Sequence, residues 1–234
     1  MQPDRFDVSA PLGDLSHARL DLPGGAYHLT LRPADGRVHA GGDPYREPPE
    51  LFRAHFEGAP PQVVVQDGTV RIQYPRFKLF GRSCVSGEIA LAPSVPWSIA
   101  LSGGAAHVNA DLRKLKLEGI AITGGMSVVR LLLGRPTGRV TIVITGGVHR
   151  LELLRPAVVP LRVHATGGIH DLRIDELQLG ALGGRFDWET PGENAAADLY
   201  DITLSGGASG LAIGHDGELA LPARDEPAAQ AHAG

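Results

Sequence analysis

Residues 140–153 read VTIVITGGVHRLEL, an alternating run of apolar and polar residues that stops at two glycines and then alternates again. Alternation with a period of two is typical of β-strands with one buried face. The glycine pair indicates a corner, because glycine adopts positive φ and allows close backbone approach without strain. This stretch therefore predicts two strands joined by a tight glycine corner.

The same phrase returns along the chain, and six copies align on their glycine pairs. The fourth and sixth residues after each pair are apolar in every copy, and five copies have Ser or Thr directly before the pair. The copies are GGAYHLTL from Gly24, GGAAHVNA from Gly103, GGMSVVRL from Gly124, GGVHRLEL from Gly146, GGIHDLRI from Gly167 and GGASGLAI from Gly206. From Gly103 onward they are 21, 22, 21 and 39 residues apart, and we interpret GALGGRFDW around Gly183 as a degenerate copy in the last interval.

A repeat of this length cannot bury its own apolar face, whereas stacked copies can. The pattern predicts an all-β, single-domain β-solenoid with coils of about 21 residues and neighbouring coils about 4.8 Å apart. We expect the solenoid to cover residues 1–221, with irregular N-terminal coils over 1–96 and regular coils over 97–221. Residues 222–234 are small, polar and proline-containing, which predicts a disordered tail.

Stacking in sequence order predicts which side chains become neighbours. Leu151 and Leu172 are expected to face a shared interior on adjacent coils. On the outer face, Glu152 is expected beside both Arg130 and Arg173, in the way that cross-strand charge pairs favour. Arg150 and Asp171 are expected to form a second pair of this kind.

The N-terminal part is less regular. Asp35-Gly36 and Asp67-Gly68 predict two hairpin turns, and Val70, Ile72 and Tyr74 are expected to face inward after the second turn. The proline-rich stretch 43–62 predicts irregular structure with one short helical turn at 51–56.

Two stretches of the chain, residues 91–133 and 138–172, resemble the toast-rack β-solenoid domains. The matching features are the apolar series Leu112, Leu115, Leu117, Ile120 and Ile122, the Gly-Gly-x-Ser step from Gly124, and the return of the same phrase near the end. Such domains occur in predicted adhesins and in membrane-anchored regulators of bacterial cell-envelope stress responses. Over residues 20–221, the resemblance implies a non-catalytic module that assembles with itself or with protein partners. The membrane helices that accompany the regulators are absent from this sequence.

The composition of the chain limits the partners and the cellular location that we expect. The net charge of −4 does not favour nucleic acid or an anionic membrane as a partner, and no apolar run reaches the length of a membrane-spanning helix. Cys84 is the only cysteine, which excludes an internal disulfide and fits a reducing compartment. With no secretion signal at the N-terminus, these features predict a cytoplasmic protein without direct membrane insertion.

No catalytic pattern stands out. The chain lacks a phosphate-binding loop, a dinucleotide motif and a His-Glu-x-x-His helix. Its acids in the repeat region are scattered and do not pair as the acid and base of a glycosidase do. These acids are Asp111, Glu118, Asp171, Asp175, Glu176, Asp198 and Asp201. We expect no cofactor and no enzymatic activity, and we interpret Cys84 as a half-buried strand thiol and residues 74–82 as an amphipathic strand.

The histidines offer one speculative metal site. His149 and His170 occupy the same position of successive copies, so stacking in sequence order places them about 5 Å apart, close enough to share a metal. His28 and His107 share the next position along the phrase. A stable transition-metal site needs three or four ligands, and the column supplies no third. We therefore interpret His149 and His170 as solvated corner residues.

The function that these observations favour is a non-enzymatic scaffold or protein-interaction module, with self-association as one way of acting. Two alternatives stay open. One is a regulator linked to the bacterial cell-envelope stress response through a membrane partner. The other is a carbohydrate-active or metal-dependent solenoid enzyme.

Overall fold

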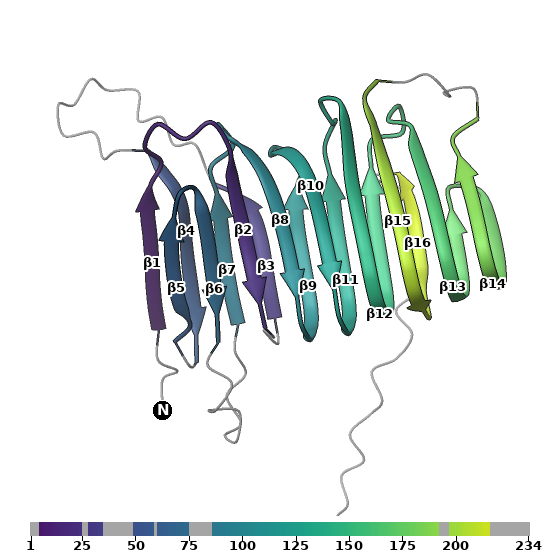
Figure 1. The fold of residues 1–234 in the computed structure, drawn as a ribbon, viewed down its shortest axis with the longest axis horizontal. Helices are drawn as coiled ribbons and strands as arrows, with labels where there is room; N and C mark the ends of the chain where they lie inside the picture. Colours follow the sequence, from purple (N-terminus) through teal and green to yellow (C-terminus); the bar gives the residue numbers. More distant parts are fainter. Residues whose placement is uncertain are drawn as a thin grey trace, which may run out of the picture.

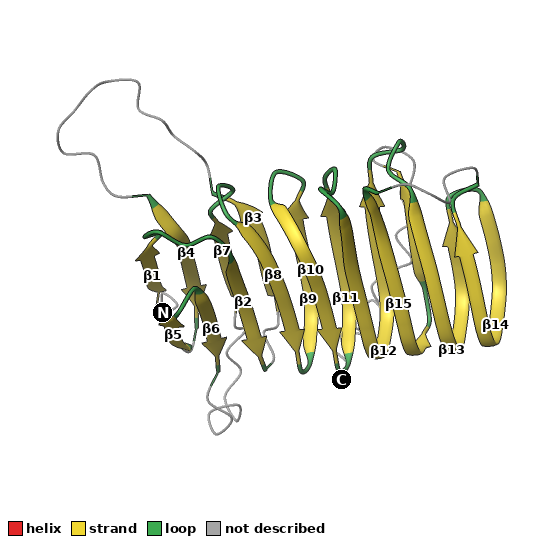
Figure 2. Ribbon diagram, turned by 45° about the horizontal axis from the view of Figure 1, so that its top comes forward, coloured by secondary structure: helices red, strands yellow, loops and turns green. Residues whose placement is uncertain are grey.

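The computed structural model describes residues 5–24, 28–34, 49–58, 60–74, 86–191 and 197–215. Within them every regular element is a β-strand, and 16 strands are hydrogen-bonded into one sheet. The sheet is folded into two layers around an interior. Neighbouring strands follow one another along the first layer as far as β12 (Arg139–Arg155), which belongs to both layers, and then back along the second. The strands lie side by side along the long axis of the molecule (Figures 1 and 2). The fold is all-β and β-solenoid-like.

A rung is defined here as the strands on both sides of one glycine corner. Adjacent rungs pair in parallel and in register, with each corner beside the next. The rungs are β2 (Ala18–Pro23) with β3 (His28–Pro33), β8 (Pro96–Ser102) with β9 (Ala105–Leu112), β10 (Lys116–Thr123) with β11 (Met126–Leu133), β12 alone, β13 (Leu161–Ile174) alone, and β15 (Leu199–Ala208) with β16 (Leu211–His215).

The repeated apolar positions form the core, as predicted. The alternation of each strand turns these residues into the space between the layers, and none of the twelve is more than 6% exposed. They are Leu29, Leu31, Val108, Ala110, Val129, Leu131, Leu151, Leu153, Leu172, Ile174, Leu211 and Ile213. Full burial of a Leu, Ile or Val side chain contributes about 1.5–3 kcal/mol, so this column is a substantial part of the hydrophobic stabilisation of the fold.

The order of the rungs differs from the order of the sequence, and this prediction was wrong. Leu211 pairs with Leu151 on one side and with Leu172 on the other. The C-terminal rung β15–β16 is therefore inserted between β12 and β13, where Figure 1 shows it in yellow-green. The first rung is displaced as well, since Leu29 lies beside Val108, 79 positions later in the chain.

The inserted rung also changes the predicted charge pairs. Arg130 does face Glu152, with 3.4 Å between Arg130 Nε and Glu152 Oε2. Glu152 and Arg173 do not pair, because both lie beside Ala212 of the inserted rung. Arg150 and Asp171 are separated by the same rung.

Both ends of the stack carry antiparallel strands. At one end β14 (Leu177–Glu189) folds back on β13, with Gly184 opposite Gly167, so the stretch around Gly183 is a hairpin strand and not a further parallel copy. At the other end the strands are antiparallel or irregular in order, and the predicted helical turn at 51–56 is wrong because these residues lie in β4. The strands there are β1 (Arg5–Pro11), β4 (Glu50–Glu57), β5 (Gln62–Gln66), β6 (Thr69–Gln73) and β7 (Ser86–Leu91).

The turn predicted at Asp67-Gly68 is confirmed, since it joins β5 to β6 and leaves Val70 and Ile72 fully buried. The turn predicted at Asp35-Gly36, residues 75–85 with Cys84, and the tail 222–234 all lie outside the described residues.

Candidate interaction surfaces

The glycine corners are the most regular feature of the surface. The first glycine of each pair has positive φ, 117° at Gly146, and its amide donates to the next rung, as from Gly124 to the carbonyl of Thr145 at 2.9 Å. A Cβ on Gly146 would lie 2.6 Å from the carbonyl oxygen of Gly124, so any side chain is excluded. The second glycine is different, because a Cβ on Gly125, Gly147 or Gly168 would meet nothing within 4 Å.

A row of hydroxyl groups runs directly before the corners. The Ser or Thr that precedes each pair lies beside its counterpart on the next rung, and the row reads Ser102, Thr123, Thr145, Ser205 and Thr166 in spatial order. The outward positions two residues earlier are also small in the middle of the stack, being Ala100, Ala121, Val143 and Thr203. The strip next to the corners therefore carries small side chains in the middle of the stack, whereas charged pairs such as Arg139 with Asp201 lie farther along the same layer.

The predicted histidine pair is separated by the inserted rung. His149 and His170 both line a shallow open groove along the second glycines, but Ser209 of the C-terminal rung lies between their strands. Two strand spacings of about 4.8 Å replace the single spacing that the sequence predicted. Within the described residues, no three His, Cys, Asp or Glu side chains are grouped as a metal site.

The structure brings a different pair of histidines together. His28 and His107 lie in register on β3 and β9, and their rings stack with centroids 4.8 Å apart and planes 8° from parallel. Their shared position in the repeated phrase was visible in the sequence. Their contact was not, because it requires the first rung to lie beside the second across 79 residues of chain.

Acidic side chains on the faces are individually engaged. Asp21 accepts two hydrogen bonds from Arg71, Asp111 accepts from Arg113, and Glu118 accepts from Ser98. The hydrogen bond from Arg113 lowers the pKa of Asp111, partly offset by burial. Asp198 accepts from the backbone amide of Gly138 at 2.6 Å. Asp21, Glu118 and Asp198 thus link neighbouring strands, whereas Asp111 bonds within its own turn.

One charged cluster is buried where three strands end. Arg155 is 1% exposed, and its guanidinium donates to Asp175 at 2.7 Å and to Nδ1 of His215 at 2.6 Å. Nε2 of His215 lies 3.4 Å from Asp175, so Asp175 joins β12 to the inserted rung. Burial lowers the pKa of Arg155, and the charge of Asp175 opposes this shift. Because the cluster joins residues at the ends of three strands, it favours the observed order of the rungs.

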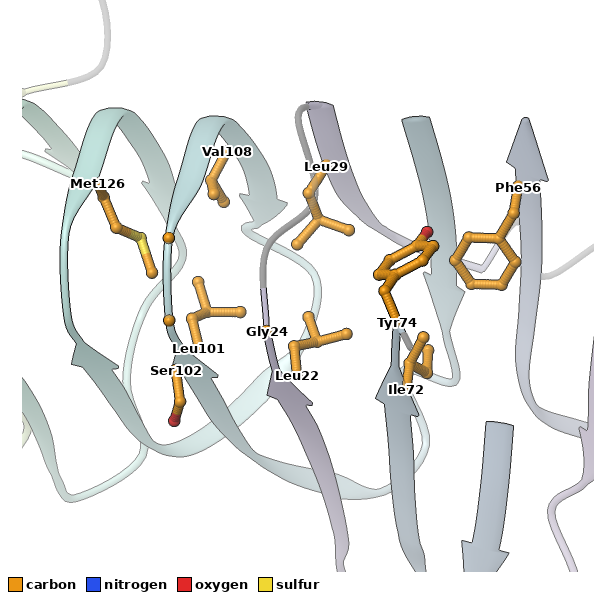
Figure 3. A pocket seen from close by; sticks show the side chains of 12 residues that line it. Leu22, Gly24, Leu29, Phe56, Ile72, Tyr74, Leu101, Ser102, Val108 and Met126 are labelled. Atoms are coloured by element: carbon orange, nitrogen blue, oxygen red, sulfur yellow. The ribbon is translucent and has the colours of Figure 1, made fainter. Parts of the chain in front are cut away.

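A small cavity lies among the described residues near the N-terminal end of the stack (Figure 3). It is lined by apolar side chains from three rungs, including Leu22, Leu101 and Met126, and from β4 and β6, and its volume of about 20 Å³ is room for one water molecule. Tyr74 lines it, and its hydroxyl is buried without a hydrogen-bond partner within the described residues. Burial raises the pKa of Tyr74 to about 12. The cavity is too small for an organic substrate.

The two ends of the stack expose strand edges. β14 pairs only with β13, so its other edge is free of strand partners within the described part of the chain. Its inward side chains are partly exposed, whereas those that it covers on β13 are at most 2% exposed. At the other end, Phe6 and Val65 are 40% and 44% exposed. The sequence indicated edges in general, but which strands would be terminal depends on the rung order.

No helix in the described residues is long and apolar enough to cross a membrane. Residues 74–82, considered as an amphipathic strand, are described only at Tyr74.

No known family model and no curated protein matches this chain. Among solved structures, the chain is similar to a "putative cell adhesion protein" from Clostridium sporogenes, with a TM-score of 0.73 and 17% identity over 92% of this chain and 100% of that one. At this identity the similarity shows a shared all-β fold. A "putative adhesin" from Bacteroides fragilis also matches over 92% of this chain and 100% of that chain, with 10% identity. Its TM-score of 0.24 is too low to show a shared fold.

Proposed function

We propose that this chain is a non-enzymatic β-solenoid scaffold of the toast-rack type that acts by binding protein surfaces, in the manner of an adhesion module. The observation that carries the proposal is the in-register stack itself. It gives two broad sheet faces and two open ends, and the carboxylates described above are engaged, most of them with a neighbouring strand and Asp111 with Arg113 of its own turn. The fold shared with the Clostridium sporogenes protein supports the same proposal.

The chemistry of the faces favours protein partners. The hydroxyl row around Thr145 is small and uncharged, and both layers also carry ion pairs, such as Arg139 with Asp201 and Arg130 with Glu152. Faces of this kind suit contact with another protein, because protein interfaces combine close packing with direct hydrogen bonds and a polar rim. A catalytic role would need convergent carboxylates or metal ligands in a cleft.

Site-specific photo-cross-linking tests the proposal. A photoreactive residue is placed at Thr145 on one face and at Arg130 on the other, with Val158, an exposed residue between β12 and β13, as the matched control. We expect defined cross-linked species, to a partner protein or to a second copy, from at least one face. Cross-linking at both faces no greater than at Val158 would contradict the proposal, as would turnover of a polysaccharide by the purified chain.

The regulator alternative depends on the sequence resemblance alone and stays a prediction, as does the cytoplasmic location.

A further inference from the structure

β14 forms one end of the stack. Its apolar side chains are placed like those of an interior rung, but no further strand of the described chain covers them. The inward side chains of β14 lie directly opposite buried residues of β13, and they pack against the core on that side only. The pairs are Leu177 with Ile174, Leu179 with Leu172, Leu182 with Ile169, Phe186 with Ala165 and Trp188 with Val163. The β13 members are at most 2% exposed, and each β14 member is partly exposed.

We propose that β14 pairs with β14 of a second copy of this chain, in antiparallel orientation about a two-fold axis at Phe186. The two stacks then join end to end, and the strand of each copy covers Phe186 and Trp188 of the other. This proposal rests on the proposed function and names one partner and one surface for it.

Charge favours a second copy as the occupant. In an antiparallel pair centred on Phe186, Arg185 of each chain lies opposite Asp187 of the other. Both side chains are exposed on the outer face, 75% and 45% respectively, and within one chain Arg185 Nε donates to Asp187 Oδ2 at 2.8 Å, so the contact between two copies would extend this pair to four charges. Opposite charges directly across an antiparallel pair stabilise it, and like charges destabilise it.

Shape favours the same arrangement. The axis at Phe186 places Trp188 opposite Gly184 of the second copy, on the inward side of the strand. A Cβ on Gly184 would meet nothing within 4 Å, so there is open space for the indole ring. The unpaired edge over residues 183–189 also offers a row of backbone donors and acceptors, which the same stretch of a second copy satisfies.

The test is charge complementation between two variants of the full chain, measured by size-exclusion chromatography with light scattering. Arg185→Asp leaves only acidic residues at the contact, and Asp187→Arg leaves only basic ones. We expect wild type to form a dimer of twice 24.7 kDa and each variant alone to dissociate at least ten times more readily. An equimolar mixture of the two variants is expected to recover the dimer, because each then supplies the charge that the other needs.

The control is Arg5→Asp, which reverses a charge on β1 at the opposite end, where Arg5 faces Glu57. It should leave the dimer intact. Melting temperatures and circular dichroism of all variants report folding, and the recovery in the mixture cannot come from misfolded chains.

Several results would overturn the proposal. The first is a wild type that stays monomeric at 100 µM, roughly the concentration at which weak dimers form. The second is a dimer that Arg5→Asp disrupts and Arg185→Asp does not. The third is an equimolar mixture of the two β14 variants that stays monomeric. Protection of amides 183–189 from hydrogen exchange in a monomer would show that another part of the same chain covers the edge. The dimer and the proposed function can fail separately. If Thr145 or Arg130 still cross-links to a partner protein in the Arg185→Asp variant, the proposed function holds even where the dimer does not form.

Discussion

Gly146 packs its bare α-carbon against the backbone of Gly124 on the neighbouring rung, so closely that a Cβ would lie 2.6 Å from the carbonyl oxygen of Gly124. Gly147, the next residue, has open space within 4 Å and no positive φ. The two glycines of one pair thus have different reasons to be glycine.

We expect Gly146→Ala to lower the free energy of unfolding by about 2 kcal/mol or more, because it combines a strained φ with a backbone clash. Gly147→Ala, the matched control, should change it by less than about 0.5 kcal/mol. Urea denaturation measures both. Equal effects of the two substitutions would contradict the assignment of the corner.

The inserted C-terminal rung predicts which pairs of introduced cysteines can be joined. In a Cys84→Ser background, Thr145→Cys with Ser205→Cys should form a disulfide on mild oxidation, since the two hydroxyl oxygens lie 3.5 Å apart on adjacent strands. Thr145→Cys with Thr166→Cys should not, because Ser205 lies between them. Mass spectrometry after proteolysis detects either product. A disulfide in the second double variant but not in the first would show stacking in sequence order.

The two buried tyrosines predict opposite effects of losing a hydroxyl. Tyr200 donates to the carbonyl of Gly134 at 2.9 Å, so Tyr200→Phe should lower the free energy of unfolding by about 1–2 kcal/mol. Tyr74 has no such partner within the described residues, so Tyr74→Phe should raise it by up to about 1 kcal/mol. Chemical denaturation at pH 7 measures both, and a marked loss of stability in Tyr74→Phe would mean that its hydroxyl is bonded.

The same tyrosines predict alkaline sensitivity. The pKa of Tyr74 rises from 10.0 to about 12 in the folded chain, and burial raises that of Tyr200 as well. Stability is full below pH 10 and falls between about pH 10 and 12, where the unfolded state releases the proton first. Tyr74→Phe should reduce this loss in a denaturation series from pH 8 to 12, and an unchanged slope would argue against burial of the Tyr74 hydroxyl.

The Arg155–Asp175 pair predicts strong coupling. Asp175→Asn keeps a residue that tolerates the φ of 51° at this position but leaves the guanidinium without its counter-charge, which should cost about 3–5 kcal/mol. Arg155→Met in the same chain should recover part of that loss, because no buried charge then remains. A double-mutant cycle by urea denaturation measures the coupling, and additive effects would show that the pair does not interact.

Much of the fold was predictable because each strand carries its own signal. Alternation alone identified the buried positions, such as Leu151 and Leu172, since the period of two fixes which side chains face inward wherever the strand is placed. The glycine pairs marked the corners for an equally local reason. The stretch at 51–56 was mistaken for a helical turn because its proline-rich surroundings obscured the pattern of a strand.

The sequence by itself determined how any two rungs fit together, through the shared phrase of Ser or Thr, two glycines and alternating apolar residues. Only the tertiary structure decided which rungs are neighbours, because a phrase that repeats makes every rung an acceptable partner for every other. Contacts across the insertion settle the order, among them Asp175 with Arg155 and Asp198 with the amide of Gly138. His28 beside His107, His149 apart from His170, and β14 at an open end all follow from that order.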